Sequence, residues 1–154
     1  MAKPPSRSAG LLLYRFRDDQ LEVLIAHMGG PFWAKKDERA WSIPKGEYSD
    51  DEEPLAAARR EFEEELGSPP PDGEALPLGE VRQSSGKRVV AWAVEGDFDA
   101  TSIRSNTFTT EWPPRSGRTA EFPEIDRAEW VDLSTARRKL VKAQVGLLDA
   151  LEDI

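Results

Sequence analysis

Carboxylates are concentrated in one helix-sized run at residues 46–67, which reads GEYSDDEEPLAAARREFEEELG. Within it Glu61, Glu64 and Glu65 stand at positions i, i+3 and i+4, so a helix places them on one side. Like charges at these spacings repel each other, and a divalent cation would relieve that repulsion. Carboxylate oxygens are also the ligands that Mg²⁺ prefers. The spacing therefore predicts a metal site able to bind phosphates, and the alternative is a solvated acidic helix face.

The composition restricts the metal and the partners. The chain has no cysteine and a single histidine, His27, so we expect an oxygen-ligated ion, Mg²⁺ with Mn²⁺ as a substitute. A net charge of −8 argues against broad binding to nucleic acid or to an anionic membrane. No apolar run is long enough to span a bilayer, and residues 1–8 lack the apolar core of a signal peptide. The absence of cysteine is compatible with a cytoplasmic location.

Strands are expected on both sides of the glutamate run, because short apolar stretches alternate with turn residues. Asp18 and Asp19 indicate a tight turn between the first two strands, and Ser85 and Gly86 indicate a turn between two later ones. The predicted strands are 9–16, 21–27, 78–83 and 87–95, with further strands near 107–112 and 129–133, and residues 41–43 lead into the glutamate run.

Two helices complete the predicted order. Pro54 suits the first turn of the glutamate-rich helix, and Ser134 can cap a closing helix that runs toward Leu151. The segments 28–40 and 112–123 are expected to be long loops. This order favours one α/β domain over residues 1–154, with residues 1–7 as a flexible N-terminus and a mixed β-sheet between helices, an α/β/α sandwich.

The glutamate run resembles the Nudix box, in which Gly, five residues, Glu and seven residues precede Arg-Glu-aliphatic-any-Glu-Glu-any-Gly-aliphatic. Phe62 replaces the first aliphatic residue and Ser68 the second, and neither is a proposed ligand. Every fixed position matches: Gly46, Glu52, Arg60, Glu61, Glu64, Glu65 and Gly67. The resemblance implies an α/β/α sandwich and hydrolysis of a pyrophosphate linkage.

The resemblance also implies roles for residues of the run. Arg60 would hold a carboxylate in place by paired hydrogen bonds. Glu61 would be either a third metal ligand or the group that activates water. The expected metal ligands are Glu61, Glu64, Glu65, Glu52 and the backbone carbonyl of Lys45 or Gly46. In this family the general base is either a glutamate of the box or an acid from a later loop, for which Glu121 and Glu124 are the candidates.

The substrate is expected to lie along the long loops, where positive and aromatic side chains gather. The Pro-Lys-Gly sequence at 44–46 resembles diadenosine tetraphosphate hydrolases and MutT-like triphosphatases. Candidate substrate-binding residues are Lys45, His27, Trp33, Lys35, Trp112 and Arg115, each of which has packing or solvation as its alternative. The expected substrate is a small-molecule dinucleoside polyphosphate or nucleoside triphosphate. The alternative function is a non-catalytic Nudix-fold nucleotide-binding or regulatory module, but such modules usually lose box carboxylates that this chain keeps.

Overall fold

The computed structural model describes residues 7–84 and 86–154. Its strands are β1 (Arg7–Arg17), β2 (Gln20–Met28), β3 (Trp41–Ser42), β4 (Lys45–Glu47), β5 (Leu76–Arg82), β6 (Arg88–Glu95), β7 (Thr107–Glu111), β8 (Thr119–Pro123) and β9 (Ile125–Asp132). Its helices are α1 (Pro54–Leu66), the 3₁₀ helix η1 (Lys142–Gln144), α2 (Leu133–Lys139) and α3 (Val145–Glu152). The flexible N-terminus expected at 1–7 and the turn residue Ser85 lie outside the described residues, except that Arg7 belongs to β1.

The main sheet is mixed, as predicted. Five strands follow the order β3-β2-β1-β6-β5, while β4 pairs with β1 and β9 pairs with β2. The central strands β1 and β6 run parallel, whereas the other pairs are antiparallel. The run Leu11-Leu12-Leu13 in β1 is completely buried, which is typical of a strand covered on both faces.

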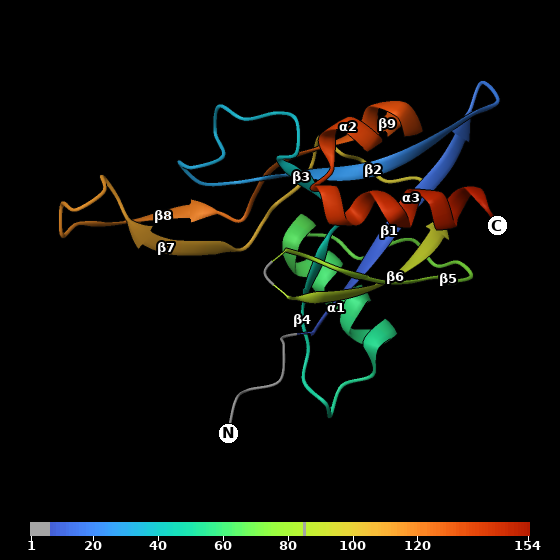
Figure 1. Cartoon of the computed structure of the whole chain (residues 1–154), viewed down its shortest axis with the longest axis horizontal. Helices are drawn as coiled ribbons and strands as arrows, with labels where there is room; N and C mark the ends of the chain where they lie inside the picture. Colours follow the sequence, from blue (N-terminus) through green and yellow to red (C-terminus); the bar gives the residue numbers. More distant parts are fainter. Residues whose placement is uncertain (1–6, 85) are drawn as a thin grey trace.

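Helices cover both faces of this sheet, so the predicted α/β/α sandwich is confirmed (Figure 1). On one face, Phe62 and Leu66 of α1 belong to the same buried cluster as Leu11 and Leu13 of β1. On the other face, Leu148 of α3 belongs to the cluster that contains the intervening Leu12 and Trp41. The alternation along β1 therefore divides the core into two layers.

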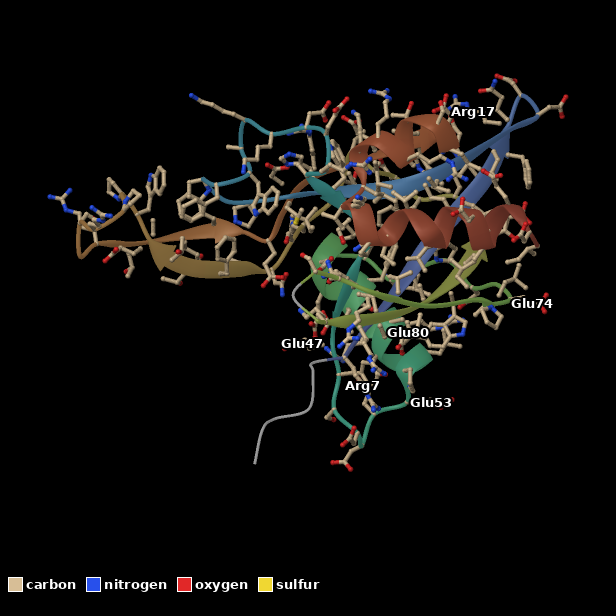
Figure 2. The ribbon with its side chains drawn as sticks, viewed as in Figure 1. Arg7, Arg17, Glu47, Glu53, Glu74 and Glu80 are labelled. Atoms are coloured by element: carbon tan, nitrogen blue, oxygen red, sulfur yellow. The ribbon has the colours of Figure 1, made fainter. Side chains whose placement is uncertain are left out.

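The segment 112–123 is not a plain loop, and that prediction was wrong in part. Its last five residues form β8, which pairs with β7 in a separate two-stranded sheet, with Phe108 opposite Phe122. The prolines, glycine and arginines at 113–118 form only the turn. β7 and β8 together make an arm, residues 107–123, that projects away from the main sheet (Figure 1 and Figure 2).

The closing helix is also divided, contrary to the single helix that was predicted. After α2 the backbone of Leu140 is extended, with ψ 147°, and Val141 N–H donates to the carbonyl of Trp41 at 2.9 Å. This pairing with β3 stops the helix, and Gly146 lies inside α3. The N-cap of α2 is Asp132, whose carboxylate accepts from Thr135 N–H at 2.8 Å, so Ser134 is not the cap.

Among the described residues, no helix is both long enough and apolar enough to cross a membrane.

Candidate active site

The helix α1 begins where the sequence predicts. Pro54 occupies its first turn, and Gly67 ends it with φ 83°. A side chain on Gly67 would lie 2.6 Å from the carbonyl oxygen of Arg104, so this close approach requires glycine. The segment 104–106 is hydrogen-bonded to the end of α1. Arg104 N–H donates to Leu66 O at 2.9 Å, and Asn106 N–H donates to Glu64 O at 3.1 Å.

Arg60 collects three carboxylates of the predicted ligand set. Its Nε and Nη2 donate to the two oxygens of Glu52 at 2.7 and 2.9 Å. Its Nη1 donates to Glu61 at 2.7 Å and to Glu64 at 3.2 Å. The hydrogen bonds that Arg60 donates, above all those to Glu52, raise the pKa of Arg60, and Arg60 in turn lowers the pKa of Glu52. One guanidinium thus offsets the repulsion that the spacing of the glutamates creates.

Gly46 is the position at which the box segment touches the helix. It lies in β4, opposite Ala9 of β1. A Cβ added to Gly46 would overlap the carboxylate of Glu61, so this carboxylate occupies the space that any other residue would fill. Burial raises the pKa of Glu61, while its bond to Arg60 acts in the opposite direction. Gly46 therefore leaves the space that the carboxylate of Glu61 occupies.

Glu65 is the most buried carboxylate of the run, with 8% of its surface exposed. One of its oxygens accepts a hydrogen bond from Lys45 N–H at 3.3 Å. Burial raises the pKa of Glu65 to about 8 and lowers the pKa of Lys45. A cation bound beside Glu65 would stabilise its ionised form, which burial disfavours.

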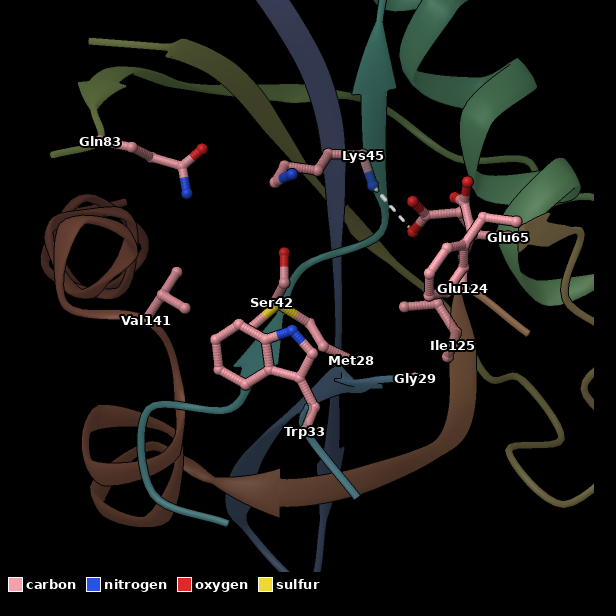
Figure 3. Close-up of a pocket in the computed structure, with 11 residues that line it drawn as sticks. Met28, Gly29, Trp33, Ser42, Lys45, Glu65, Gln83, Glu124, Ile125 and Val141 are labelled. Carbon is pink, nitrogen blue, oxygen red and sulfur yellow. Dashed lines mark hydrogen bonds between the residues drawn. The ribbon is translucent and has the colours of Figure 1, made fainter. Parts of the chain in front are cut away.

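Two adjoining cavities lie beside these residues; Lys45, Gly46, Glu61, Glu64 and Glu65 line them, whereas Glu52 and Arg60 line neither. The first, which we call the acidic cavity, has a volume of about 420 Å³ and is lined by Lys45, Gly46, Glu47, Glu61, Glu64, Glu65, Lys87, Asn106 and Glu124. The second, the apolar cavity, has a volume of about 270 Å³ and is lined by Met28, Gly29, Trp33, Ser42, Lys45, Glu65, Gln83, Phe108, Glu124, Ile125 and Val141 (Figure 3). Lys45, Glu65 and Glu124 border both cavities.

Glu124 sits where the arm joins the sheet. Its N–H donates to Asn106 O at 2.9 Å, and its carbonyl accepts from Gly29 N–H at 2.7 Å. Asn106 is also bonded to the backbone of Glu64. A continuous chain of backbone hydrogen bonds therefore links the end of α1, the base of the arm and the loop that begins at Gly29.

The acidic cavity fits a hard cation in its chemistry. Its donors are carboxylate and carbonyl oxygens, which suit Mg²⁺ or Mn²⁺. Over residues 7–84 and 86–154, no three acidic or histidine side chains already surround one point as a ligand set. Instead, Arg60 holds Glu61 and Glu64, and the backbone of Lys45 holds Glu65. Ligation would therefore require these side chains to turn from their present partners toward the ion.

The structure brings some predicted substrate residues to the cavities. Lys45 borders both, and Trp33 lines the apolar one. His27 does not reach either cavity: it is completely buried, with Nδ1 2.8 Å from an Asp126 oxygen and Nε2 2.7 Å from Lys36 O. Both ring nitrogens of His27 are thus occupied, so its place is in the packing of the core.

The remaining predicted residues line neither cavity. Glu121 is exposed on β8, and Lys35 is exposed in the 28–40 loop. Trp112, which directly follows β7, packs edge-on against Phe32 with ring centroids 5.8 Å apart. Arg115 lies at the tip of the arm, where its N–H donates to Glu111. The arm and the loop therefore contact each other, but their charged tips lie outside the two cavities.

Ten lining residues were not predicted as site residues, among them Gln83, Lys87, Asn106 and Phe108. Gln83 and Lys87 flank the β5–β6 turn, Asn106 precedes β7, and Phe108 lies within it. The only signal for the first two is that polar residues after a strand often carry function. Phe108 lies on a strand whose alternation was visible, but its contact with the cavity depends on how the arm folds back.

Comparison with known proteins agrees with this geometry. The chain matches the NUDIX domain family over residues 4–151, whereas a search of curated proteins gives no match. Among solved structures, it resembles a Caenorhabditis elegans Ap4A hydrolase in a binary complex, with 20% identity, 96% of each chain covered and a TM-score of 0.67.

Two other solved structures have the same fold. The NUDIX domain of Shewanella oneidensis NrtR, complexed with ADP ribose, is 17% identical over 99% of this chain and 89% of that one, with a TM-score of 0.67. A MutT protein from Methanosarcina mazei Go1 is 17% identical over 99% and 96%, with a TM-score of 0.61. At these identities the likenesses show the fold. The family match covers nearly the whole chain, so the chain belongs to the NUDIX family.

Proposed function

We propose that this protein catalyses the Mg²⁺-dependent hydrolysis of a pyrophosphate linkage in a nucleoside diphosphate joined to another moiety. The observation that carries the proposal is that the acidic and apolar cavities adjoin and share Lys45, Glu65 and Glu124. A nucleotide is charged at one end and flat and apolar at the other, so it needs two such compartments side by side.

The carboxylates of the acidic cavity would hold the metal. The proposed ligands are Glu61, Glu64 and Glu65, with Glu52 as an outer ligand and the carbonyl of Lys45 or Gly46 completing the set. When bound, Mg²⁺ would neutralise phosphate oxygens and lower the barrier to attack by water. Arg60 acts as the positioning residue, because its five N–H donors fix the carboxylates that must share this small volume.

The general base is assigned to Glu124 in preference to Glu121. Glu124 borders both cavities, and hydrogen bonds on each side hold its backbone. Glu121 is exposed on the arm and borders neither. A base must lie within hydrogen-bond reach of the attacking water, which favours the acid at the junction. Glu61, whose pKa is raised by burial, is the alternative base, and Lys45 would contact a phosphate between the two cavities.

The substrate class is a dinucleoside polyphosphate or a nucleoside triphosphate. One similar structure is described as an Ap4A hydrolase, and another is complexed with ADP ribose. Both names denote compounds in which a nucleoside diphosphate is joined to a further group. The apolar cavity, about 270 Å³, lies just below the range of about 300–1,000 Å³ usual for ligand pockets, so it would take one nucleoside and leave the second group outside. A chain without cysteine suits the cytoplasm as the site of this activity.

A nucleotide panel tests the proposal. Diadenosine tetraphosphate, nucleoside triphosphates and nucleotide sugars are incubated with Mg²⁺ in ¹⁸O-labelled water, and the products are separated by chromatography. We expect cleavage of one or more dinucleoside polyphosphates or triphosphates, with the label identifying the phosphorus that is attacked. Binding without turnover in both Mg²⁺ and Mn²⁺ would contradict the proposal and support the regulatory module instead.

A further inference from the structure

The apolar cavity has two chemically different ends. Figure 3 shows Glu65 and Glu124 on one side of it and Gln83 and Val141 on the other, with Lys45 between them. The first end is shared with the acidic cavity, where the phosphates would bind. A nucleotide placed there must extend its base toward Gln83 and Val141, because the phosphates and the base occupy opposite ends of the molecule.

The walls between these ends suit a flat aromatic ring. Trp33 contributes an indole and Phe108 a phenyl ring from the arm, while Met28, Ile125 and Val141 supply aliphatic surface. Aromatic side chains stack on any base, so these walls provide binding energy without distinguishing one base from another. Discrimination must come from the polar groups of the cavity.

Most of those polar groups are already occupied. The hydroxyl of Ser42 donates to Ile43 O at 2.7 Å and accepts from Gln144 Nε2 at 3.0 Å. Glu65 and Glu124 lie at the phosphate end, and Lys45, which lies between the two ends, contacts a phosphate under the proposed function. Ser42, Lys45 and the two carboxylates are therefore not the groups that recognise the edge of a base at the far end.

Gln83 differs from them. Its backbone is fixed in the β5–β6 turn, since its N–H donates to Lys87 O and its carbonyl accepts from Gly86 N–H, both at 2.8 Å. Its side-chain amide has no hydrogen-bond partner among the residues that the structure describes, and Figure 3 shows this amide directed into the cavity. A half-buried amide without a partner offers a ligand an NH₂ group as donor and, beside it, a carbonyl oxygen as acceptor.

We propose that Gln83 determines the base specificity of this enzyme and selects adenine over guanine. In this proposal Gln83 faces the edge of the base that carries atoms 6 and 7 and not the Watson–Crick edge. On that edge an amide, which presents a donor beside an acceptor, matches N6 and N7 of adenine, whereas O6 and N7 of guanine are both acceptors. The inference rests on the proposed function for the orientation of the nucleotide. It adds the residue that recognises the base and the base that it selects.

The test compares matched substrates with each variant. ATP and GTP carry the same triphosphate, so the ratio of kcat/KM for ATP to kcat/KM for GTP does not respond to changes that affect only the binding of the triphosphate. Gln83→Leu removes both hydrogen-bonding groups and should reduce the ratio roughly five- to 150-fold, the range that one bidentate base contact supplies. Gln83→Lys presents donors only and should reverse the preference toward GTP, because a lysine ammonium suits the two acceptors of guanine. Ser84→Ala, an exposed change in the same turn, should leave the ratio unchanged.

A binding measurement separates this inference from the proposed function. The affinity of the wild type and of Gln83→Leu for AMP and GMP is measured without metal, and thermal unfolding confirms that each variant is folded. If no nucleotide is hydrolysed but AMP binds more tightly than GMP only when Gln83 is present, the proposed function fails and the inference stands. The inference is overturned if the wild type shows no preference for adenine in either assay, or if folded Gln83→Leu keeps the wild-type ratio.

Discussion

Replacing Gly46 by alanine tests how far the arrangement of the glutamates depends on position 46 having no side chain. Gly46 lies in β4 and pairs with Ala9, so the backbone itself can accept alanine. The new Cβ, however, would overlap the carboxylate of Glu61, and it would lie 2.6 Å from the Cγ of that residue. Because the obstructing group is the end of a flexible side chain, Glu61 would rotate away and leave its place beside Arg60.

The effect on stability should be small, because two minor contributions oppose each other. The Arg60–Glu61 pair has a guanidinium that is 39% exposed, so losing it costs about 0.2–1 kcal/mol. Alanine in a strand recovers roughly 0.5–1 kcal/mol relative to glycine. The effect on turnover should be large, because displacing a catalytic group by about 1 Å can cost roughly 100-fold.

The assay measures urea unfolding and Mg²⁺-dependent turnover on the same preparations. Gly146→Ala in α3 is the matched control, since its Cβ would meet only Val81 Cγ1 at an ordinary 3.7 Å. The control should gain up to about 1 kcal/mol in stability and keep wild-type turnover. If Gly46→Ala is folded and turns over substrate like the wild type, the position of Glu61 does not matter for catalysis and the reasoning is refuted.

Three further changes test other parts of the structure. Gln144→Met removes the buried acceptor of Ile43 N–H, 2.9 Å away, and should lower the free energy of unfolding by about 1–3 kcal/mol; an unchanged urea midpoint would contradict this. Asp132→Ala removes the cap that accepts from Thr135 N–H and should cost about 1 kcal/mol at neutral pH. Because that bond lowers the pKa of Asp132 from 3.8, its contribution to stability is present above this pH and is lost as the pH falls. The difference in the free energy of unfolding between the wild type and Asp132→Ala should therefore shrink in acid. For Glu65 the sign is opposite: its pKa is raised from 4.5 to about 8, so its contribution is present at low pH and is lost as the pH rises through that interval. In metal-free protein the stability of the wild type relative to Glu65→Gln should therefore fall over this range in denaturant titrations, and a constant difference would show that Glu65 titrates normally.

The parts of the fold that were predictable are those that local pattern determines. The helix α1 follows from Pro54, the apolar spacing that ends in Phe62 and Leu66, and Gly67. The hairpin of β1 and β2 follows from two apolar runs around Asp18 and Asp19, which both have positive φ. These features depend on neighbours in the sequence, and the structure reproduces them closely.

The errors arise where distant segments decide the conformation. Residues 140–141 leave the helix because they pair with Trp41, about a hundred positions earlier in the chain. The strand β8 forms because β7 pairs with it, although the prolines and the glycine in the turn before it favour a loop over residues 112–123. The amino-acid composition and the periodicity of apolar residues do not show which distant segments pair with each other.

The candidate site divides in the same way. The spacing of Glu61, Glu64 and Glu65 placed them on one side of α1, and all three line the acidic cavity. The spacing could not show that Arg60 holds two of them, nor that Gln83 closes the neighbouring cavity, because both facts depend on how separate segments meet. For His27 the sequence indicated a polar group near the loops, whereas its burial directs both nitrogens to internal partners.

Turnover by Glu64→Gln tests the central claim most directly. This change keeps the size of the side chain and removes the charge that would bind the metal, while Glu64 is nearly half exposed, so folding should be unaffected. At matched Mg²⁺ concentrations and on the best substrate of the wild type, the account predicts that turnover falls by orders of magnitude while the melting temperature is unchanged. A folded Glu64→Gln protein with near-full activity would contradict the assignment of this glutamate run as the metal-dependent centre of hydrolysis.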